Sequence, residues 1–409
     1  MESISAVSQP TLTPPRTEAP PSGRPPAEWP PSEWHIPALD GIRALAILLV
    51  VPHNVDMANA PYPAYLYPIA TVLHAGWIGV QLFFVLSGFL ITGKLLDSRG
   101  ADNYFRGFFG KRVLRIFPLY YAVLCIAFVI APRFLTMPEQ LHASESHEIW
   151  LWLFVANWTE PFTGVVYGFA HFWSLCVEEQ FYLLWPLVVL LCGPRTLVKV
   201  CVATAVVALV VRCALVAAHF PHEALYLFTV CRMDALTLGA AAAALIRIPE
   251  AAAALRRLAP RLTWVTVALL VATAAGTRAF AMYDVSTQTI GYTLLSLTFM
   301  LVMLLTVVPT TGATGWTMRV LSTTPLRLIG RYSYGMYVLH YPIHMFLGVP
   351  LLGRLAPQPT PWESLAYAAV ITLVSFLLAA LSYEFFERHM LKLKTRFTPS
   401  WRAYTPGPA

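Results

Sequence analysis

Charged residues are scarce in this sequence. Of its 409 residues, 12% are charged and 57% are hydrophobic, whereas soluble domains carry about 25% charged residues. The apolar residues gather in runs long enough to cross a bilayer as helices. The composition therefore excludes an ordinary soluble protein and predicts an all-α, polytopic integral membrane protein.

Several common functional motifs are missing as well. The sequence contains no Gly-rich phosphate loop, no HExxH motif and no CxxC pair. All six cysteines lie in or beside apolar runs, so we expect small buried side chains, with no disulfide and no metal site. The net charge of +7 comes from Lys and Arg beside the apolar runs, which indicates membrane topology and not nucleic-acid binding.

The chain divides into three parts. Residues 1–35 are rich in Pro, Ser, Thr and Glu, which is typical of a disordered tail. Residues 36–390 form the predicted transmembrane domain, and residues 391–409 a short basic tail. The ten predicted spans are residues 37–56, 76–97, 113–131, 172–192, 197–218, 224–246, 262–280, 288–308, 328–350 and 363–385. Residues 149–158 are too short to span and predict an interfacial or re-entrant helix.

The distribution of basic residues predicts how the chain crosses the membrane. If the N-terminus is cytoplasmic, the inner loops and the C-terminal tail hold most Lys and Arg, while the outer loops hold only Arg133 and Arg354, with Arg278 close to an outer end. This asymmetry follows the positive-inside rule for an even number of spans. We therefore expect a multi-pass protein of the cell (inner) membrane with both termini cytoplasmic.

Ionisable residues inside the apolar segments are the strongest functional signal, because burying them in a bilayer is costly. Arg43 and His53 lie ten residues apart in the first segment. The other members of this set are Arg112, Arg115, Glu178, Glu179, Arg232, Asp234 and His340. Individually, each has a structural explanation: topology anchors for Arg112 and Arg115, an ion pair for Arg232 with Asp234, and packing for a lone histidine.

Helical spacing suggests which of these residues act together. Arg112 and Arg115 are three residues apart and share a face, as do Ser174, Glu178 and Tyr182 at intervals of four. Depth along the helices places the arginines near the cytoplasm and His53 roughly 15 Å further out. We predict that Glu178 faces an inner cavity near His53. Glu179, turned by about 100°, would instead form a structural pair, with Arg232 as the partner considered.

This distribution of charge suits an anionic donor that enters from the cytoplasm. Coenzyme A has the required shape, with a phosphate-rich head and a long arm that ends in a thioester. Arg112, Arg115 and Arg43 would bind the donor. His53, Glu178 and Arg43 would act in catalysis, with neutral His53 taking a proton from an acceptor hydroxyl. Glu179, Arg232, Asp234, Ser174, Tyr182 and His340 would have structural or supporting roles.

Seven motifs in order resemble the membrane-bound acyltransferase family 3, which contains bacterial O-antigen O-acetylases. They are LDGIRALAILLVVPH (39–53), GVQLFFVLSGFLIT (79–92), KRVLRIFPLYY (111–121), FWSLCVEEQFYLLWPL (172–187), RMDALTLGA (232–240), GRYSYGMYVLHYPI (330–343) and YEFFERHM (383–390). The resemblance implies ten transmembrane helices, an acyl-CoA donor and transfer to a hydroxyl, often on a sugar. It maps the essential Arg and His of the family's first helix onto Arg43 and His53, although many members have one more residue between them.

The sequence thus predicts an O-acyltransferase that moves an acyl group from cytoplasmic acyl-CoA to a hydroxyl of a cell-envelope glycan. Acetyl is the acyl group assumed at the outset. Two alternatives stay open: a proton-coupled transporter and acylation of a small-molecule secondary metabolite. A flippase or polymerase of lipid-linked glycans is a weaker rival. The sequence leaves the acceptor, the acyl group, a covalent intermediate and the oligomeric state undetermined.

Overall fold

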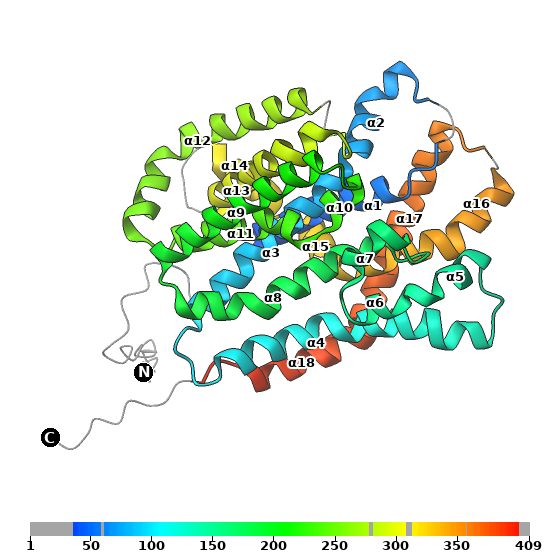
Figure 1. Cartoon of the computed structure of the whole chain (residues 1–409), viewed down its shortest axis with the longest axis horizontal. Helices are drawn as coiled ribbons and strands as arrows, with labels where there is room; N and C mark the ends of the chain where they lie inside the picture. Colours follow the sequence, from blue (N-terminus) through cyan, green and yellow to red (C-terminus); the bar gives the residue numbers. More distant parts are fainter. Residues whose placement is uncertain (1–35, 59–60, 278–280, 308–312, 357, 401–409) are drawn as a thin grey trace, which may run out of the picture. The chain divides into compact units, whose positions relative to one another are not determined.

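The computed structural model describes residues 36–58, 61–277, 281–307, 313–356 and 358–400 (Figure 1). The expected disordered tail, residues 1–35, lies outside these ranges. Every regular element in them is helical. The α-helices are α1 (Pro37–Asn54), α2 (Tyr67–His74), α3 (Ile78–Asp97), α4 (Tyr104–Leu124), α5 (Glu139–Ser144), α6 (Glu148–Trp152), α7 (Ala156–Thr163), α8 (Trp173–Leu191), α9 (Pro194–Ala217), α10 (His222–Leu227), α11 (Thr229–Leu245), α12 (Pro249–Gly276), α13 (Tyr292–Val307), α14 (Ala313–Leu321), α15 (Thr324–Ile343), α16 (Val349–Leu355), α17 (Pro361–Ser382) and α18 (Arg388–Lys392).

The all-α, polytopic membrane fold predicted from composition is confirmed. Within the described ranges, eight helical stretches are long and apolar enough to cross a membrane. A ninth candidate is α12, whose two arms, Pro249–Leu258 and Arg261–Gly276, meet at 75°. The remaining expected segment, residues 37–56, corresponds to α1, which is 18 residues long and carries Asp40 and Arg43. Each of the ten expected segments therefore overlaps a helix, although α1 is not among the stretches that are apolar enough to count as a span.

Helix α3 lies at the centre of the packing. It contacts α11, α1, α13 and α8, and α1 in turn packs against α15. Glycines allow the closest of these crossings, because a Cβ atom on Gly88 of α3 would overlap the main chain at Leu236, and one on Gly239 of α11 would overlap it at Val85. Small residues let helix backbones approach in this way within membranes. Helix α3 thus packs against both α1 and α8, the helices that line the site described below.

The segments outside the long helices complete the fold. Residues 149–158, expected to form one interfacial or re-entrant helix, fall in two short helices, α6 and α7, which are separated by Phe154 with its positive φ of 55°. Residues 391–400, the first part of the expected C-terminal tail, continue the helical path of α18 through a 3₁₀ turn, Leu393–Phe397. This terminal segment contacts α4.

The two charged residues of α11 do not pair with each other. Asp234 forms a fully buried ion pair with Arg212 of α9, at 2.9 Å, and accepts a hydrogen bond from Thr293 at 2.8 Å. Arg232 instead donates a hydrogen bond to Gln81 of α3. The expected Arg232–Asp234 pair is therefore wrong, because residues two apart on a helix point in different directions and each side chain meets a different neighbouring helix.

We expect Arg212→Met to destabilise the protein by about 3–5 kcal/mol, because it leaves Asp234 charged and unpaired in an apolar interior. The double variant Arg212→Met/Asp234→Leu should recover much of this loss. Thermal unfolding in detergent measures both. Arg195→Ala is the matched control, since Arg195 pairs with Glu250 on the surface and should cost no more than about 1 kcal/mol. Equal losses from Arg212→Met and Arg195→Ala would contradict the role given to the buried pair.

Candidate active site

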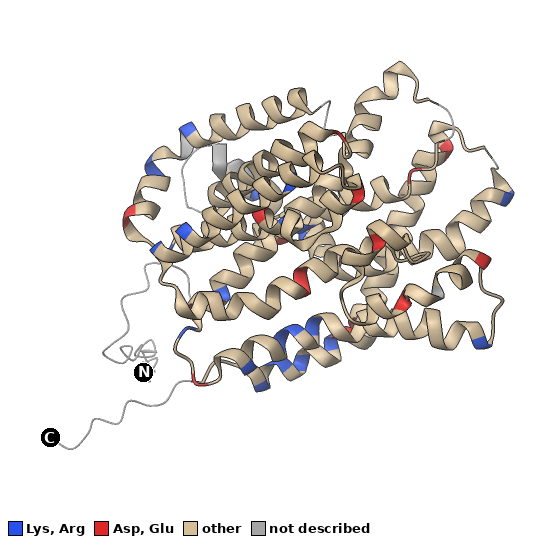
Figure 2. Cartoon of the chain, viewed as in Figure 1, with Lys and Arg blue, Asp and Glu red and all other residues tan. Residues whose placement is uncertain are grey.

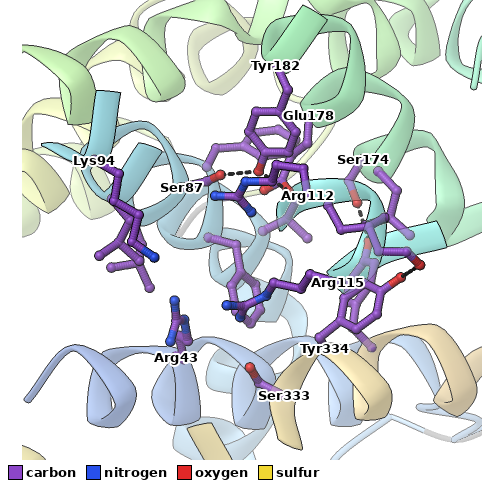
Figure 3. Close-up of a pocket in the computed structure, with 18 residues that line it drawn as sticks. Arg43, Ser87, Lys94, Arg112, Arg115, Ser174, Glu178, Tyr182, Ser333 and Tyr334 are labelled. Carbon is purple, nitrogen blue, oxygen red and sulfur yellow. Dashed lines mark hydrogen bonds between the residues drawn. The ribbon is translucent and has the colours of Figure 1, made fainter. Parts of the chain in front are cut away.

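An internal cavity lies between α1, α3, α4, α8 and α15, and we call it the chamber (Figure 3). Its apolar walls come mainly from α3. Its polar and charged lining residues are Arg43, Ser87, Lys94, Arg112, Arg115, Ser174, Glu178, Tyr182, Ser333, Tyr334 and Tyr337. Figure 3 shows Arg43, Arg112 and Arg115 pointing toward the same space from α1 and α4. The structure thus gathers the predicted donor-binding arginines, which are far apart in the sequence.

The cations of the chamber are poorly neutralised. Arg43 donates a hydrogen bond to Asp40 at 2.8 Å. Within the described part of the chain, Arg112 and Arg115 have no ion pair and no hydrogen-bond acceptor, and the Arg112 guanidinium lies over the Tyr182 ring, 4.7 Å from its centroid. Unpaired cations at membrane depth are costly. Their retention therefore favours a site that binds an anion.

Glu178 is the carboxylate that lines the chamber. It accepts a hydrogen bond from the Tyr182 hydroxyl at 2.7 Å, and Tyr182 is hydrogen-bonded in turn to Ser87. Ser174 shares a 2.6 Å hydrogen bond with the Tyr337 hydroxyl. The expected common face of Ser174, Glu178 and Tyr182 is present, and all three residues line the chamber. Their functional roles stay predictions.

Glu179 does not meet the partner considered for it. Its carboxylate has a buried oxygen without a hydrogen bond, and the basic group that acts on it is Arg112 of α4. Arg232 is held elsewhere, between the Tyr226 and Tyr292 rings at 4.9 and 4.3 Å. The expected Glu179–Arg232 pair is therefore wrong, because α8 turns Glu179 toward α4, whereas Arg232 packs against α3.

His53 lies outside the chamber, near the end of α1. Its Nδ1 atom is 2.8 Å from the Leu73 carbonyl oxygen. A carbonyl only accepts, so Nδ1 carries the proton and Nε2 has the free lone pair. The chain at Gly76 packs closely against α1 here, since a Cβ atom on Gly76 would overlap both Leu49 and His53. A main-chain carbonyl thus holds the tautomer of His53.

The expected proximity of Glu178 and His53 is not found. Glu178 lines the chamber together with Arg43 and Arg112, while the ionisable groups that act on His53 are His74 and Asp56. Similar depth in the membrane did not make the two residues neighbours. Glu178 shares the chamber with Arg43 of α1, whereas His53 lies ten residues further along α1, against Leu73.

Further polar residues surround the end of α1. The Asp56 carboxylate accepts hydrogen bonds from Tyr62 at 2.8 Å and from Ser364 at 2.6 Å. Burial, aided by this hydrogen bond to Asp56, raises the pKa of Tyr62 to about 12. Tyr62 therefore stays neutral at physiological pH and acts as a donor. Asp56, Tyr62 and Ser364 thus form a second polar zone, beside the end of the helix that carries Arg43.

His340 connects the two polar zones. Its Nδ1 donates to the Tyr337 carbonyl at 2.7 Å, and its Nε2 accepts from Asn54, the residue after His53, at 3.0 Å. The Tyr337 hydroxyl lines the chamber and bonds to Ser174. Both ring nitrogens of His340 are thus engaged, which favours the structural role expected for this residue.

A second cavity, which we call the vestibule, adjoins the chamber. The two share Arg43, Arg115 and Tyr334 in their walls. The vestibule adds basic residues near the start of α15 and in the terminal segment, Arg327, Arg331 and Lys394, together with the carboxylates of Asp40 and Glu387. The basic lining therefore continues from the chamber toward the ends of the helices that the positive-inside rule assigns to the cytoplasm. Figure 2 shows Lys and Arg gathered along α4 and α18.

Sequence reasoning missed several residues of these cavities. Lys94 was interpreted only as a topology signal, although it lines the chamber. Ser87 sits in an apolar motif, and Lys394 in the expected tail. The sequence did carry a signal for Lys94, because this residue lies near the end of a predicted span, as Arg112 does. For Lys394, no pattern in the sequence indicates that the segment folds back on α4.

Comparison with known proteins identifies the family. A family model described as an acyltransferase domain, Acyl_transf_3, matches residues 36–380. The chain therefore belongs to the acyltransferase 3 family, as the seven motifs predicted. No solved structure matches significantly.

Among curated proteins, the chain is similar to bacterial O-acetyltransferases. It is 27% identical over 380 residues to peptidoglycan O-acetyltransferase OatA of Listeria monocytogenes, which covers 88% of this chain and 56% of the relative. It is 29% identical over 377 residues to the putative peptidoglycan O-acetyltransferase YrhL of Bacillus subtilis, covering 87% and 54%. It is 27% identical over 380 residues to O-acetyltransferase OatA of Staphylococcus aureus, covering 88% and 57%. The chain thus spans about half the length of these relatives.

The two glutamates of α8 should respond differently to substitution. Glu178→Gln should lower turnover about 10²-fold, the scale of one positioned acid–base group, at normal protein yield, because Gln cannot carry the charge. Glu179→Gln should leave turnover within a few-fold and change yield or thermal stability instead. Turnover per folded protein, measured after gel filtration, separates the two effects. The reverse pattern would exchange the roles, and equal loss of yield in both would make the pair purely structural.

Proposed function

We propose that this protein is a membrane-bound O-acyltransferase of the cell (inner) membrane. In this proposal it takes an acyl group, acetyl in the first instance, from cytoplasmic acyl-CoA and transfers it to a hydroxyl of a cell-envelope glycan. The observation that carries the proposal is the set of basic residues that line both vestibule and chamber, among which Arg112 and Arg115 have no ion-pair partner in the described part of the chain. Membership of the acyltransferase family supports the reaction class, and the names of the relatives make peptidoglycan the first acceptor to test.

The charges suit the two ends of coenzyme A. Its phosphates would bind at the vestibule and at the chamber arginines, where planar guanidinium groups form bidentate hydrogen bonds to phosphate. The thioester arm would then extend outward along the chamber, past Ser174 and Tyr337, toward the end of α1. A neutral pocket would not distinguish such an anion from an uncharged metabolite.

His53 is the proposed general base. Its Nδ1–H is held by the Leu73 carbonyl, which leaves Nε2 to take the proton of the acceptor hydroxyl. The hydroxyl oxygen forms a bond to the thioester carbonyl carbon, the carbon–sulfur bond breaks, and the leaving thiolate receives the proton from His53. An ester and free CoA result, so the step needs no oxidant, reductant or metal.

The proposal is tested with purified protein, [¹⁴C]acetyl-CoA and a soluble peptidoglycan fragment. We expect label in an alkali-labile ester on the fragment, with release of one CoA for each acetyl group. Transport of label or protons in proteoliposomes without ester formation would favour the transporter alternative and overturn the proposal. Ester formation on a small hydroxylated metabolite, but on no glycan, would keep the reaction and replace the acceptor.

A further inference from the structure

The terminal segment Arg388–Ser400 forms part of the cavity system. It lies beyond residue 380, where the match to the family model ends. It consists of α18, the 3₁₀ turn Leu393–Phe397 and three further residues. In Figure 1, α18 runs along α4, and the contacts agree. This placement brings the segment beside the helix that carries Arg112 and Arg115.

Specific contacts fix the end of the segment to the start of α4. The Asn103 amide donates to the Thr398 carbonyl at 2.7 Å and accepts from the Ser400 main-chain nitrogen at 2.9 Å. The Asp102 main-chain nitrogen donates to the Ser400 carbonyl at 2.9 Å. Three hydrogen bonds thus join residues 398–400 to residues 102–103. The end of the segment is therefore docked on the protein and is not a solvated tail.

A glycine of α4 makes room for the segment. A Cβ atom on Gly110 would lie within 2.7 Å of three atoms of the Phe397 ring. Phe397 is partly buried, whereas its neighbours Thr395 and Arg396 are exposed. The Phe397 ring therefore seats on Gly110, one turn before Leu114 and Arg115.

This docking places one lysine in the vestibule. Lys394 is partly buried and lines the cavity together with Arg43, Arg115 and Arg327. It has no carboxylate within ion-pair distance among the described residues. By contrast, Lys392 and Arg396 are exposed to solvent and do not line the vestibule. Of these three basic residues, only Lys394 thus faces the cavity, whose lining also includes the carboxylates of Asp40 and Glu387.

We propose that Arg388–Ser400 is a built wall of the donor site and that Lys394 binds a phosphate of the donor's head group. The proposal rests on the proposed function and adds to it. The donor is a phosphorylated nucleotide carrier, and Lys394, which lies outside the region matched by the family model, binds it at the vestibule. The terminal segment then has a binding role, and its docking on α4 positions Lys394.

The first test compares donor binding by Lys394→Ala with that of matched surface variants, Lys392→Ala and Arg396→Ala. The probes are coenzyme A and the phosphate-free compound pantetheine, and the readout is Kd by calorimetry of the full-length protein in detergent. We expect CoA to bind about tenfold or more weakly to Lys394→Ala, the scale of one charge-assisted hydrogen bond, with pantetheine affected less than twofold. The surface variants should bind CoA within about twofold of the unchanged protein.

The outcomes separate the two proposals. If the unchanged protein binds no CoA, the donor in the proposed function is wrong. If it binds CoA, but Lys394→Ala matches Lys392→Ala, the inference about the terminal segment is wrong and the proposed function survives. An equal loss for CoA and pantetheine in Lys394→Ala would also overturn the phosphate contact.

The second test displaces the segment without touching Lys394. Gly110→Ala should push the Phe397 ring from its seat and weaken CoA binding to a similar degree. In the double variant Gly110→Ala/Lys394→Ala, the losses should not add, because a displaced Lys394 no longer contacts the phosphate. Fully additive losses, or normal CoA affinity in Gly110→Ala, would show that docking on α4 does not position Lys394. A thermal-unfolding scan confirms that each variant is folded.

Discussion

Replacing His53 with alanine is expected to abolish acyl transfer, with kcat reduced at least about 10²–10⁴-fold, the range for a general base. The loss should appear in kcat, with little change in the Kd for acyl-CoA, because His53 lies outside the chamber that holds the arginines. Protein yield and thermal stability should stay near normal, since the ring makes one hydrogen bond, to a main-chain carbonyl. Turnover of labelled acetyl-CoA measures the effect.

His74→Ala is the matched control for this experiment. His74 lies beside Leu73, but its side chain is 69% exposed, so its loss should change turnover by no more than a few-fold. If His53→Ala keeps near-normal turnover, His53 is removed from the mechanism. His340 would be the next candidate, although both of its ring nitrogens already have partners.

The second large effect is expected at α4. Arg112→Ala and Arg115→Ala should each weaken acyl-CoA binding about 10–100-fold, the scale of a charge-assisted hydrogen bond of 1.5–3 kcal/mol, while acceptor binding stays unchanged. Both guanidinium groups lack a hydrogen-bond acceptor among the described residues, although Arg112 acts on the nearby carboxylates of Glu178 and Glu179, so a thermal-unfolding scan checks that each variant is folded. The CoA Kd by calorimetry and the acceptor KM at saturating donor give the two numbers.

Lysine replacements distinguish phosphate binding from topology. Lys anchors the inner end of a helix as well as Arg does, but it lacks the planar fork that binds phosphate at two points. Arg112→Lys and Arg115→Lys should therefore insert normally and bind CoA weakly. Full donor affinity in both would refute bidentate binding and leave the arginines as anchors.

Helix positions and local faces could be predicted from the sequence, because they depend on residues near one another in the chain. Apolar runs of about 20 residues coincide with the helices, and intervals of four placed Ser174, Glu178 and Tyr182 on one face of α8. The chamber arginines were predicted as a set because all of them lie toward the inner ends of their helices.

Lateral neighbours could not be predicted, because depth along a helix does not determine which helix lies beside it. Glu178 and His53 were placed at similar depth, but Glu178 lines the chamber together with Arg43, and His53 lies outside it. Asp234 was assigned to Arg232 because the two are close in sequence, whereas its partner, Arg212, belongs to α9. These neighbours depend on how the helices pack side by side, which only the three-dimensional structure shows.

In the proposed function, donor and acceptor are used on opposite sides of one membrane, with the donor at the basic side. This arrangement is tested most directly in sealed proteoliposomes of known protein orientation, with [¹⁴C]acetyl-CoA on one side and a membrane-impermeant peptidoglycan fragment on the other. We expect labelled fragment only when acetyl-CoA has access to the side that bears Arg112, Arg115 and Lys394. Equal labelling from either side, or labelling only when both substrates share one side, would contradict it.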